Sequence, residues 1–135
     1  HDTLAAMICD KLFERHPRLR VASIENGASW VGGLIQKLEI TGNQYPDWFA
    51  EPPLETFRRH VWVAPFWEDD PVETARTLGV ERTLLGSDWP HLEGVADPSS
   101  YADRLTALGE AGTRRVMRDN AAELTRPPSH LRTRY

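Results

Sequence analysis

The segment RTLLGSDWPH, residues 82–91, decides how this chain folds. It opens with an apolar run around Leu84 and Leu85 and continues into a polar turn that starts at Ser87 and Asp88. Short apolar runs bounded by turn residues are typical of buried strands. We therefore expect a strand over residues 82–88, with the Asp88 carboxylate at its carboxyl end.

Two similar runs precede this segment, and helical patterns lie between them. Residues 19–25 and 60–65 are rich in apolar, β-favouring side chains. Apolar residues at helical spacing predict helices over residues 3–16, 71–78, 99–108 and 113–124, with a further helix after residue 29, a loop over 45–53 and one helical turn over 54–59. Strands that alternate with helices indicate βαβ units, so we predict an α/β fold with a parallel sheet.

Several residues are expected to set helix ends. Ser29 is predicted to cap the helix that follows it, and Gly42-Asn43 to end that helix in a left-handed conformation. Asp70 precedes a proline at the first helical position and a glutamate three residues after the cap, which is a strong helix-start signature. Gly79 is predicted to end the helix that Asp70 begins.

Three strands are too few for a complete parallel barrel, which has eight strands and typically about 250 residues. If the chain is part of a barrel, its first and last strands expose backbone groups that other strands normally pair. The sequence therefore predicts a segment that needs a partner, or that is only marginally folded.

Composition and charge are those of an ordinary globular domain. The 135 residues are 40% hydrophobic and 27% charged, with a formal net charge of −4. The absence of a basic stripe argues against nucleic-acid binding. Cys9 is the only cysteine, which excludes a disulfide framework within the chain. No apolar run approaches the roughly 20 residues that span a membrane, and we expect a cytoplasmic protein.

The chain begins with His1 rather than Met, so we expect a longer product whose start precedes this residue. We expect residues 1–126 to form one folded segment and residues 127–135 to form a loose basic tail.

Candidate functional residues lie at the carboxyl ends of the predicted strands, where the following loops converge in parallel α/β folds. Asp88 is the best of them, because a carboxylate there can bind a metal or take a proton from water. Spacing alone weighs this role evenly against a turn cap. Glu25 can bind metal, orient a ligand or pair with an arginine. Glu68 and Asp69 are predicted to lie in a solvated loop.

Two neighbours of Asp88 have similar alternatives. His91 can be a ligand or a solvated side chain, and exposure of loop histidines favours the second. Trp89 can stack on a substrate or pack beneath the loop. The chain contains no His-x-His, no His-Glu-x-x-His and no phosphate-binding glycine loop, so the motifs support part of a metal site rather than a complete one.

Four ordered motifs resemble the amidohydrolase-related (amidohydrolase 2) family, in the branch that includes aminocarboxymuconate-semialdehyde decarboxylase. They are PRLRVASIENGASW (17–30), RRHVWVAPFWEDD (58–70), LGSDWPH (85–91) and DNAAEL (119–124). They resemble, in that order, the sixth, seventh and eighth strand regions and the closing helix of that family. The resemblance extends over most of the chain, from about residue 4 to 124.

The resemblance implies the carboxyl-terminal part, about strands 6 to 8, of a (β/α)8 barrel that binds a divalent metal, commonly zinc. It assigns to Asp88 a metal-binding and catalytic role in hydrolysis or decarboxylation of a small aromatic or carboxylate substrate. Glu25 stands where decarboxylases of the family carry a histidine, and we expect Glu25, Trp89 and His91 to contact substrate.

The histidine motifs of the resembled family are not in this chain, so we expect the chain alone to be inactive and to hold no stoichiometric zinc. As partners we expect either a separate polypeptide that supplies the missing amino-terminal half of the barrel, or a second copy of the chain in a homo-oligomer. The alternative is a non-catalytic α/β module that associates through its exposed strand edges.

Overall fold

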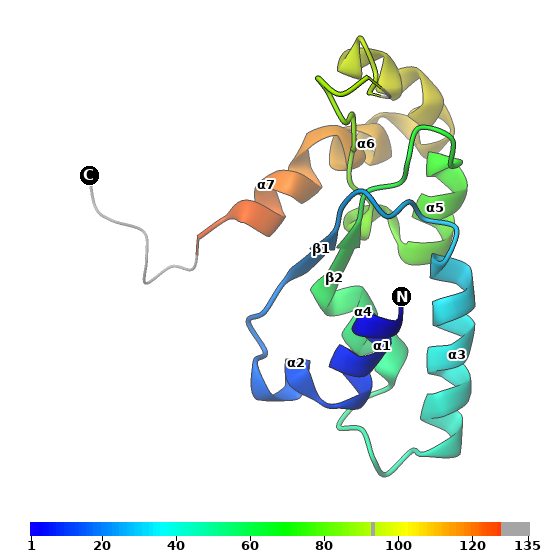
Figure 1. Ribbon diagram of the computed structural model, residues 1–135, viewed down its shortest axis with the longest axis vertical. Helices are drawn as coiled ribbons and strands as arrows, with labels where there is room; N and C mark the ends of the chain where they lie inside the picture. The colour runs from blue at the N-terminus through cyan, green and yellow to red at the C-terminus, as the bar shows by residue number, and fades with distance from the viewer. Residues whose placement is uncertain (93, 128–135) are drawn as a thin grey trace.

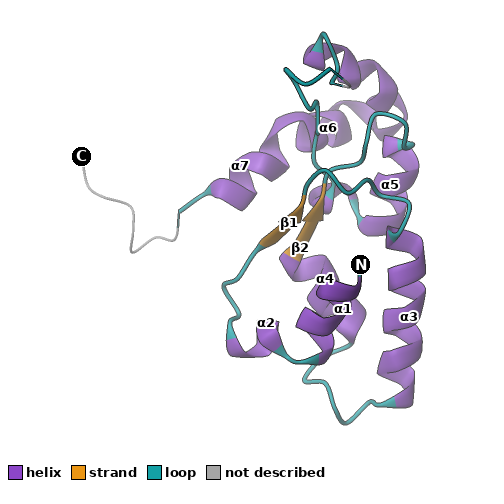
Figure 2. Ribbon diagram, in the orientation of Figure 1, coloured by secondary structure: helices purple, strands orange, loops and turns teal. Residues whose placement is uncertain are grey.

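In the computed structural model, helices lie on one side of a small two-stranded sheet and beyond both of its ends (Figure 1), and helix is the main secondary structure of the chain (Figure 2). The structure describes residues 1–92 and 94–127, so the predicted basic tail lies outside the described residues except for Pro127. No helix among these residues has the length and apolarity needed to cross a membrane. The α-helices are α1 (Asp2–Cys9), α2 (Leu12–Arg15), α3 (Val31–Gln44), α4 (Pro53–His60), α5 (Pro71–Leu78), α6 (Gly109–Arg114) and α7 (Asn120–Thr125).

The remaining elements are two short strands and segments of 3₁₀ and π helix. Strands β1 (Val21–Ser23) and β2 (Val61–Val63) pair in parallel, with Val21 opposite Val61 and Ser23 opposite Val63. The Ala64 N–H continues the ladder by donating to the Ser23 carbonyl at 3.0 Å. There are also 3₁₀ helices η1 (Val80–Arg82) and η2 (Pro98–Leu108) and a π-helical turn η3 (Arg115–Asp119). The parallel sheet confirms the predicted α/β class.

The third predicted strand, residues 82–88, is wrong as a full strand. A single parallel bridge joins Thr83 to Val63, and the Leu84 N–H donates to the Val63 carbonyl. On the side of the segment away from β2, other partners bond to the backbone groups. The Asn120 side-chain amide donates to the Thr83 carbonyl at 2.8 Å, and the Leu85 N–H donates to the Val116 carbonyl. This bridge segment, residues 82–88, still runs beside β2, so its end still reaches the same edge of the sheet.

The sheet is apolar on both faces, as expected of parallel strands. Val61 and Val63 of β2 pack with α1 to α5 in the largest core cluster, which includes Phe57 and Leu34. Trp62, between the two valines, faces a second cluster that contains residues from the bridge segment and α7. Packing of β2 against helices α1 to α5 on one face and α7 on the other therefore fixes the position of its carboxyl end.

Helix boundaries test the predicted caps. Asp70 caps α5 by accepting hydrogen bonds from two backbone N–H groups, and α5 ends before Gly79, as predicted. Ser29 caps nothing, because α3 begins at Val31 with Trp30 at its cap position. Gly42 lies inside α3, which continues to Gln44. The predicted helix over 3–16 is broken at Lys11, whose φ of 59° is left-handed.

Tyr101 of η2 is fully buried, and its hydroxyl has no hydrogen-bond partner. An unpaired buried hydroxyl costs about 1–3 kcal/mol, so Tyr101→Phe is expected to raise the free energy of unfolding by about 1 kcal/mol. Burial also raises the pKa of Tyr101 from 10.0 to about 12. Because the pKa of Tyr101 is higher in the folded than in the unfolded chain, its ionisation leaves the stability unchanged below pH 10 and lowers it as the pH rises from 10 toward 12.

The measurement is urea unfolding of both proteins at neutral pH and between pH 10 and 12. The phenylalanine variant should lose less stability than the wild type across the alkaline range. Equal losses in both proteins would contradict a raised pKa, and a less stable variant at neutral pH would show that the hydroxyl has a partner in solution.

Candidate functional site

Three loops converge where the parallel segments end (Figure 1). They follow β1, β2 and the bridge segment at residue 83, in the way that loops of parallel folds meet at one edge. A cavity of about 700 Å³ lies between them. Its lining residues come from all three loops: Ile24, Glu25, Ala64, Pro65, Phe66, Trp67, Glu68, Gly86, Ser87, Asp88 and His91.

The loop from Ser87 to Val95 is closed at its base and carries two of the candidate residues. The Val95 N–H donates to the Ser87 carbonyl at 2.8 Å, which joins the two ends of the loop. Inside it, the His91 N–H donates to the Asp88 carbonyl at 2.8 Å. This turn brings the two side chains together, and His91 Nδ1 lies 3.1 Å from Asp88 Oδ1.

Glu25 approaches the same pair from the loop after β1. Its Oε1 lies 4.0 Å from His91 Nδ1, and both side chains are 62% exposed. One ligand atom from each of Glu25, Asp88 and His91 can be chosen so that all lie within 4.8 Å of one another. The structure thus brings together three of the four residues for which the sequence predicted site roles.

Glu25 and Asp88 have an unusual backbone conformation for loop residues. Glu25 has φ 57° and Asp88 has φ 50°, both in the left-handed region. Such conformations cost of the order of 1–3 kcal/mol each and often mark functional sites. Lys11 shares the conformation at the α1–α2 break, so left-handed backbone alone does not identify a site. At Glu25 and Asp88 it coincides with the shared cavity.

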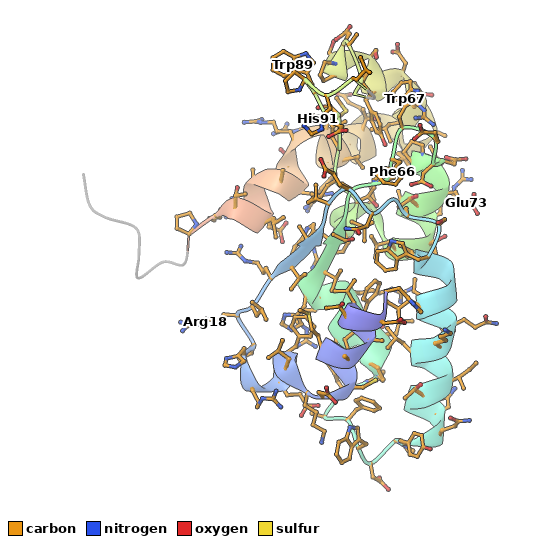
Figure 3. All side chains as sticks on the ribbon, in the orientation of Figure 1. Arg18, Phe66, Trp67, Glu73, Trp89 and His91 are labelled. Atoms are coloured by element: carbon orange, nitrogen blue, oxygen red, sulfur yellow. The ribbon has the colours of Figure 1, made fainter. Side chains whose placement is uncertain are left out.

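Trp89 is placed differently from its neighbours. Its side chain is 66% exposed, it does not line the cavity, and it lies at the periphery of the loops, away from Phe66 and Trp67 (Figure 3). A role of Trp89 in substrate binding therefore stays a prediction. The aromatic wall of the cavity is formed instead by Phe66 and Trp67, which are 47% and 41% exposed.

Asp69 corrects a sequence prediction. It was expected in a solvated loop, but its carboxylate accepts hydrogen bonds from the Ala28 and Phe66 N–H groups, which belong to two different loops. The sequence signal was weak, because Asp69 stands between Glu68 and the true helix cap Asp70 in an acidic run. Glu68 is exposed, as predicted, and lies on the cavity lining.

The donor set fits a divalent cation. Two carboxylates and one imidazole are the ligand types that zinc and related metals take in catalytic sites, where three protein ligands leave a position open. The two carboxylates also face each other across a short distance, and a cation between them would relieve their repulsion. Chemically, the arrangement can bind a metal or hold a proton between Asp88 and His91.

Comparisons with known proteins show the family to which the chain belongs. A family model described as amidohydrolase matches residues 2–126. An amidohydrolase from Mycobacterium avium subsp. paratuberculosis K-10 has a crystal structure that is 48% identical, with a TM-score of 0.85, over 92% of this chain and 32% of that one. No curated protein matches the chain.

The chain is also similar to 5-carboxyvanillate decarboxylase LigW from Sphingomonas paucimobilis. The identity is 21% and the TM-score 0.67, over 87% of this chain and 37% of that one, so this likeness concerns the fold alone. The chain spans about a third of the length of either solved protein.

Proposed function

Because the chain belongs to the amidohydrolase family, we propose that it forms the carboxyl-terminal part of a metal-dependent (β/α)8 barrel enzyme that hydrolyses or decarboxylates a small substrate. The observation that carries the proposal is the convergence of Glu25, Asp88 and His91 at the carboxyl ends of adjacent parallel segments. In barrel enzymes the catalytic residues occupy this edge.

The arrangement of segments supports a partial barrel. β1, β2 and the bridge segment lie side by side in chain order and run parallel, as consecutive strands of a barrel do. We propose that they correspond to strands 6 to 8. The outer edge of β1 would then pair with a further strand, because unpaired edges are a liability in stable proteins.

Glu25, Asp88 and His91 would hold the metal, which we propose to be zinc. When bound, such an ion polarises a substrate oxygen and makes water more acidic. The Asp88 carboxylate would accept and return a proton through Oδ1, with His91 Nδ1 at 3.1 Å as its hydrogen-bond partner. Phe66 and Trp67 would exclude water from one side of the cavity and contact an apolar or aromatic part of the substrate.

Metal titration tests the proposal. We expect one Co²⁺ per chain to bind reversibly and to develop visible absorption typical of oxygen and nitrogen ligands. Binding should be too weak to retain zinc through dialysis against a chelator, because the side chains of Glu25 and His91 are 62% exposed. Isothermal titration with Zn²⁺ checks the stoichiometry.

The competing candidate is a non-catalytic module that associates through its strand edges. The part-exposed residues of β1 are the observation in its favour. A chain that shows no saturable Co²⁺ absorption at millimolar metal would contradict the enzyme proposal and favour the module.

A further inference from the structure

Asp69 joins the loop after β1 to the loop after β2. One oxygen of its carboxylate, Oδ2, accepts a hydrogen bond from the Ala28 N–H and another from the Phe66 N–H, each at 2.8 Å. Ala28 lies three residues after Glu25 and is buried. Two backbone donors on one carboxylate oxygen make charge-assisted bonds, which are stronger than bonds between neutral groups.

Close packing reinforces this connection. Gly27 has φ +59°, and a Cβ built on it would lie 2.7 Å from Phe66 Cδ2 and 3.1 Å from Asp69 Oδ2. The phenyl ring therefore occupies the space that any other side chain at position 27 would need. The main chain next to Glu25 is thus pressed against the loop that carries Asp69.

Arg104 of η2 holds the other side of the same loop. Its Nη2 donates to the Asp69 carbonyl at 2.8 Å, and its Nη1 donates to the Trp67 carbonyl. The guanidinium also lies over the Trp67 ring, 4.5 Å from its centroid. The bonds of Arg104 therefore attach the loop after β2 to η2, which restricts the movement of Asp69.

We infer that Asp69 is a positioning residue, which holds the loop of Glu25 so that the Glu25 carboxylate faces Asp88 and His91. Helix capping does not explain its contacts, because the neighbouring Asp70 caps α5. The left-handed φ of 57° at Glu25 needs outside support, and the bond to Ala28 supplies it. The role of this arrangement in metal binding rests on the function proposed above.

Two variants test the inference. Asp69→Ala removes both hydrogen bonds, whereas Asp69→Asn keeps an oxygen that can accept them. With Co²⁺ as the probe, Asp69→Ala should lower the affinity by about tenfold, the lower end of the effect seen for groups that orient metal ligands. Asp69→Asn should restore most of it. Asp103→Asn, an exposed site on η2, controls for the loss of one negative charge.

Backbone ¹⁵N relaxation supplies a readout that needs no metal. In Asp69→Ala the order parameters of Glu25 and Asn26 should fall toward those of flexible loops, while those of α3 stay at the wild-type value. Amide exchange at Ala28 and Phe66 should accelerate in the same variant. Asp69→Asn should resemble the wild type in both measurements.

The outcomes separate the two proposals. A wild-type chain without saturable Co²⁺ absorption contradicts the proposed function, and the relaxation data then decide the positioning role. Unchanged order at Glu25 in Asp69→Ala overturns the positioning role whether or not metal binds. Loss of affinity in both Asp69 variants, with order retained, also overturns it, because charge rather than hydrogen bonding would then be the cause.

Discussion

Asp88→Asn is expected to lower the Co²⁺ affinity of the chain by at least about a hundredfold, because removing a direct ligand should exceed the 10–100-fold effect of changing a group behind a ligand. The amide oxygen of asparagine is neutral and binds a divalent cation less strongly than a carboxylate does. The substitution also leaves His91 Nδ1 without the carboxylate partner that lies 3.1 Å away. Under the function proposed above, the same variant of the complete enzyme should also lose its proton acceptor.

Asparagine is the informative replacement because of the backbone at this position. Asp88 has φ 50°, and asparagine tolerates the left-handed region better than other residues with a side chain. Asp88→Ala would add a backbone cost of roughly 1–2 kcal/mol to the loss of the ligand. The asparagine variant should therefore keep the wild-type unfolding midpoint while losing metal.

A matched substitution at the other carboxylate separates ligands from surface charge. Glu25→Gln removes one charge from the same cluster and should weaken Co²⁺ binding as well, whereas Glu110→Gln, an exposed residue of α6, should leave it unchanged. Co²⁺ titration and urea unfolding of the three variants give the comparison. Wild-type affinity in Asp88→Asn would remove this residue from the metal site and leave the turn-forming role as its explanation.

Local signals predicted much of the secondary structure. The α5 helix begins at Asp70 and ends before Gly79 as expected, because capping depends on residues within one turn of each other. The break at Lys11 was not predictable, since nothing in the pattern of residues 3–16 requires a left-handed residue there. The third strand is reduced to one bridge to Val63, and its Thr83 carbonyl and Leu85 N–H bond instead to Asn120 and Val116, which are distant in sequence.

The candidate site was predicted in part for a related reason. The carboxyl ends of parallel strands meet at one edge, which is enough to bring Glu25 near Asp88 without any knowledge of the loops. That His91 turns back toward Asp88 depends on the hydrogen bonds that close the loop. The bond from the Ala28 N–H to Asp69 depends on tertiary contact between residues 41 positions apart, which no local pattern reports.

Gly94→Ala is expected to open the loop that carries Asp88 and His91. A Cβ at position 94 would lie 2.4 Å from the Asp88 carbonyl oxygen and 3.0 Å from that of His91. Both contacts are with backbone, so relief requires the loop itself to move. We expect a loss of about 1–3 kcal/mol in unfolding free energy, the usual cost of overpacking.

Metal binding should suffer together with stability in this variant. The backbone that must shift holds the 3.1 Å contact between Asp88 and His91, so Co²⁺ affinity should fall by about tenfold or more. Gly33→Ala is the matched control, because a Cβ there meets nothing within 4 Å and the residue is exposed inside α3. That variant should be stabilised by roughly 0.5–1 kcal/mol, since alanine favours helix over glycine.

Urea unfolding of the two glycine variants measures the change in stability, and Co²⁺ titration measures the change in metal affinity. We expect Gly94→Ala to be less stable than the wild type and Gly33→Ala to be more stable. Only Gly94→Ala should lose Co²⁺ affinity. If Gly94→Ala binds Co²⁺ as the wild type does, the closed turn does not hold the ligands in place. The side chains of Glu25, Asp88 and His91 would then bind the metal without requiring their loops to hold them in a fixed position.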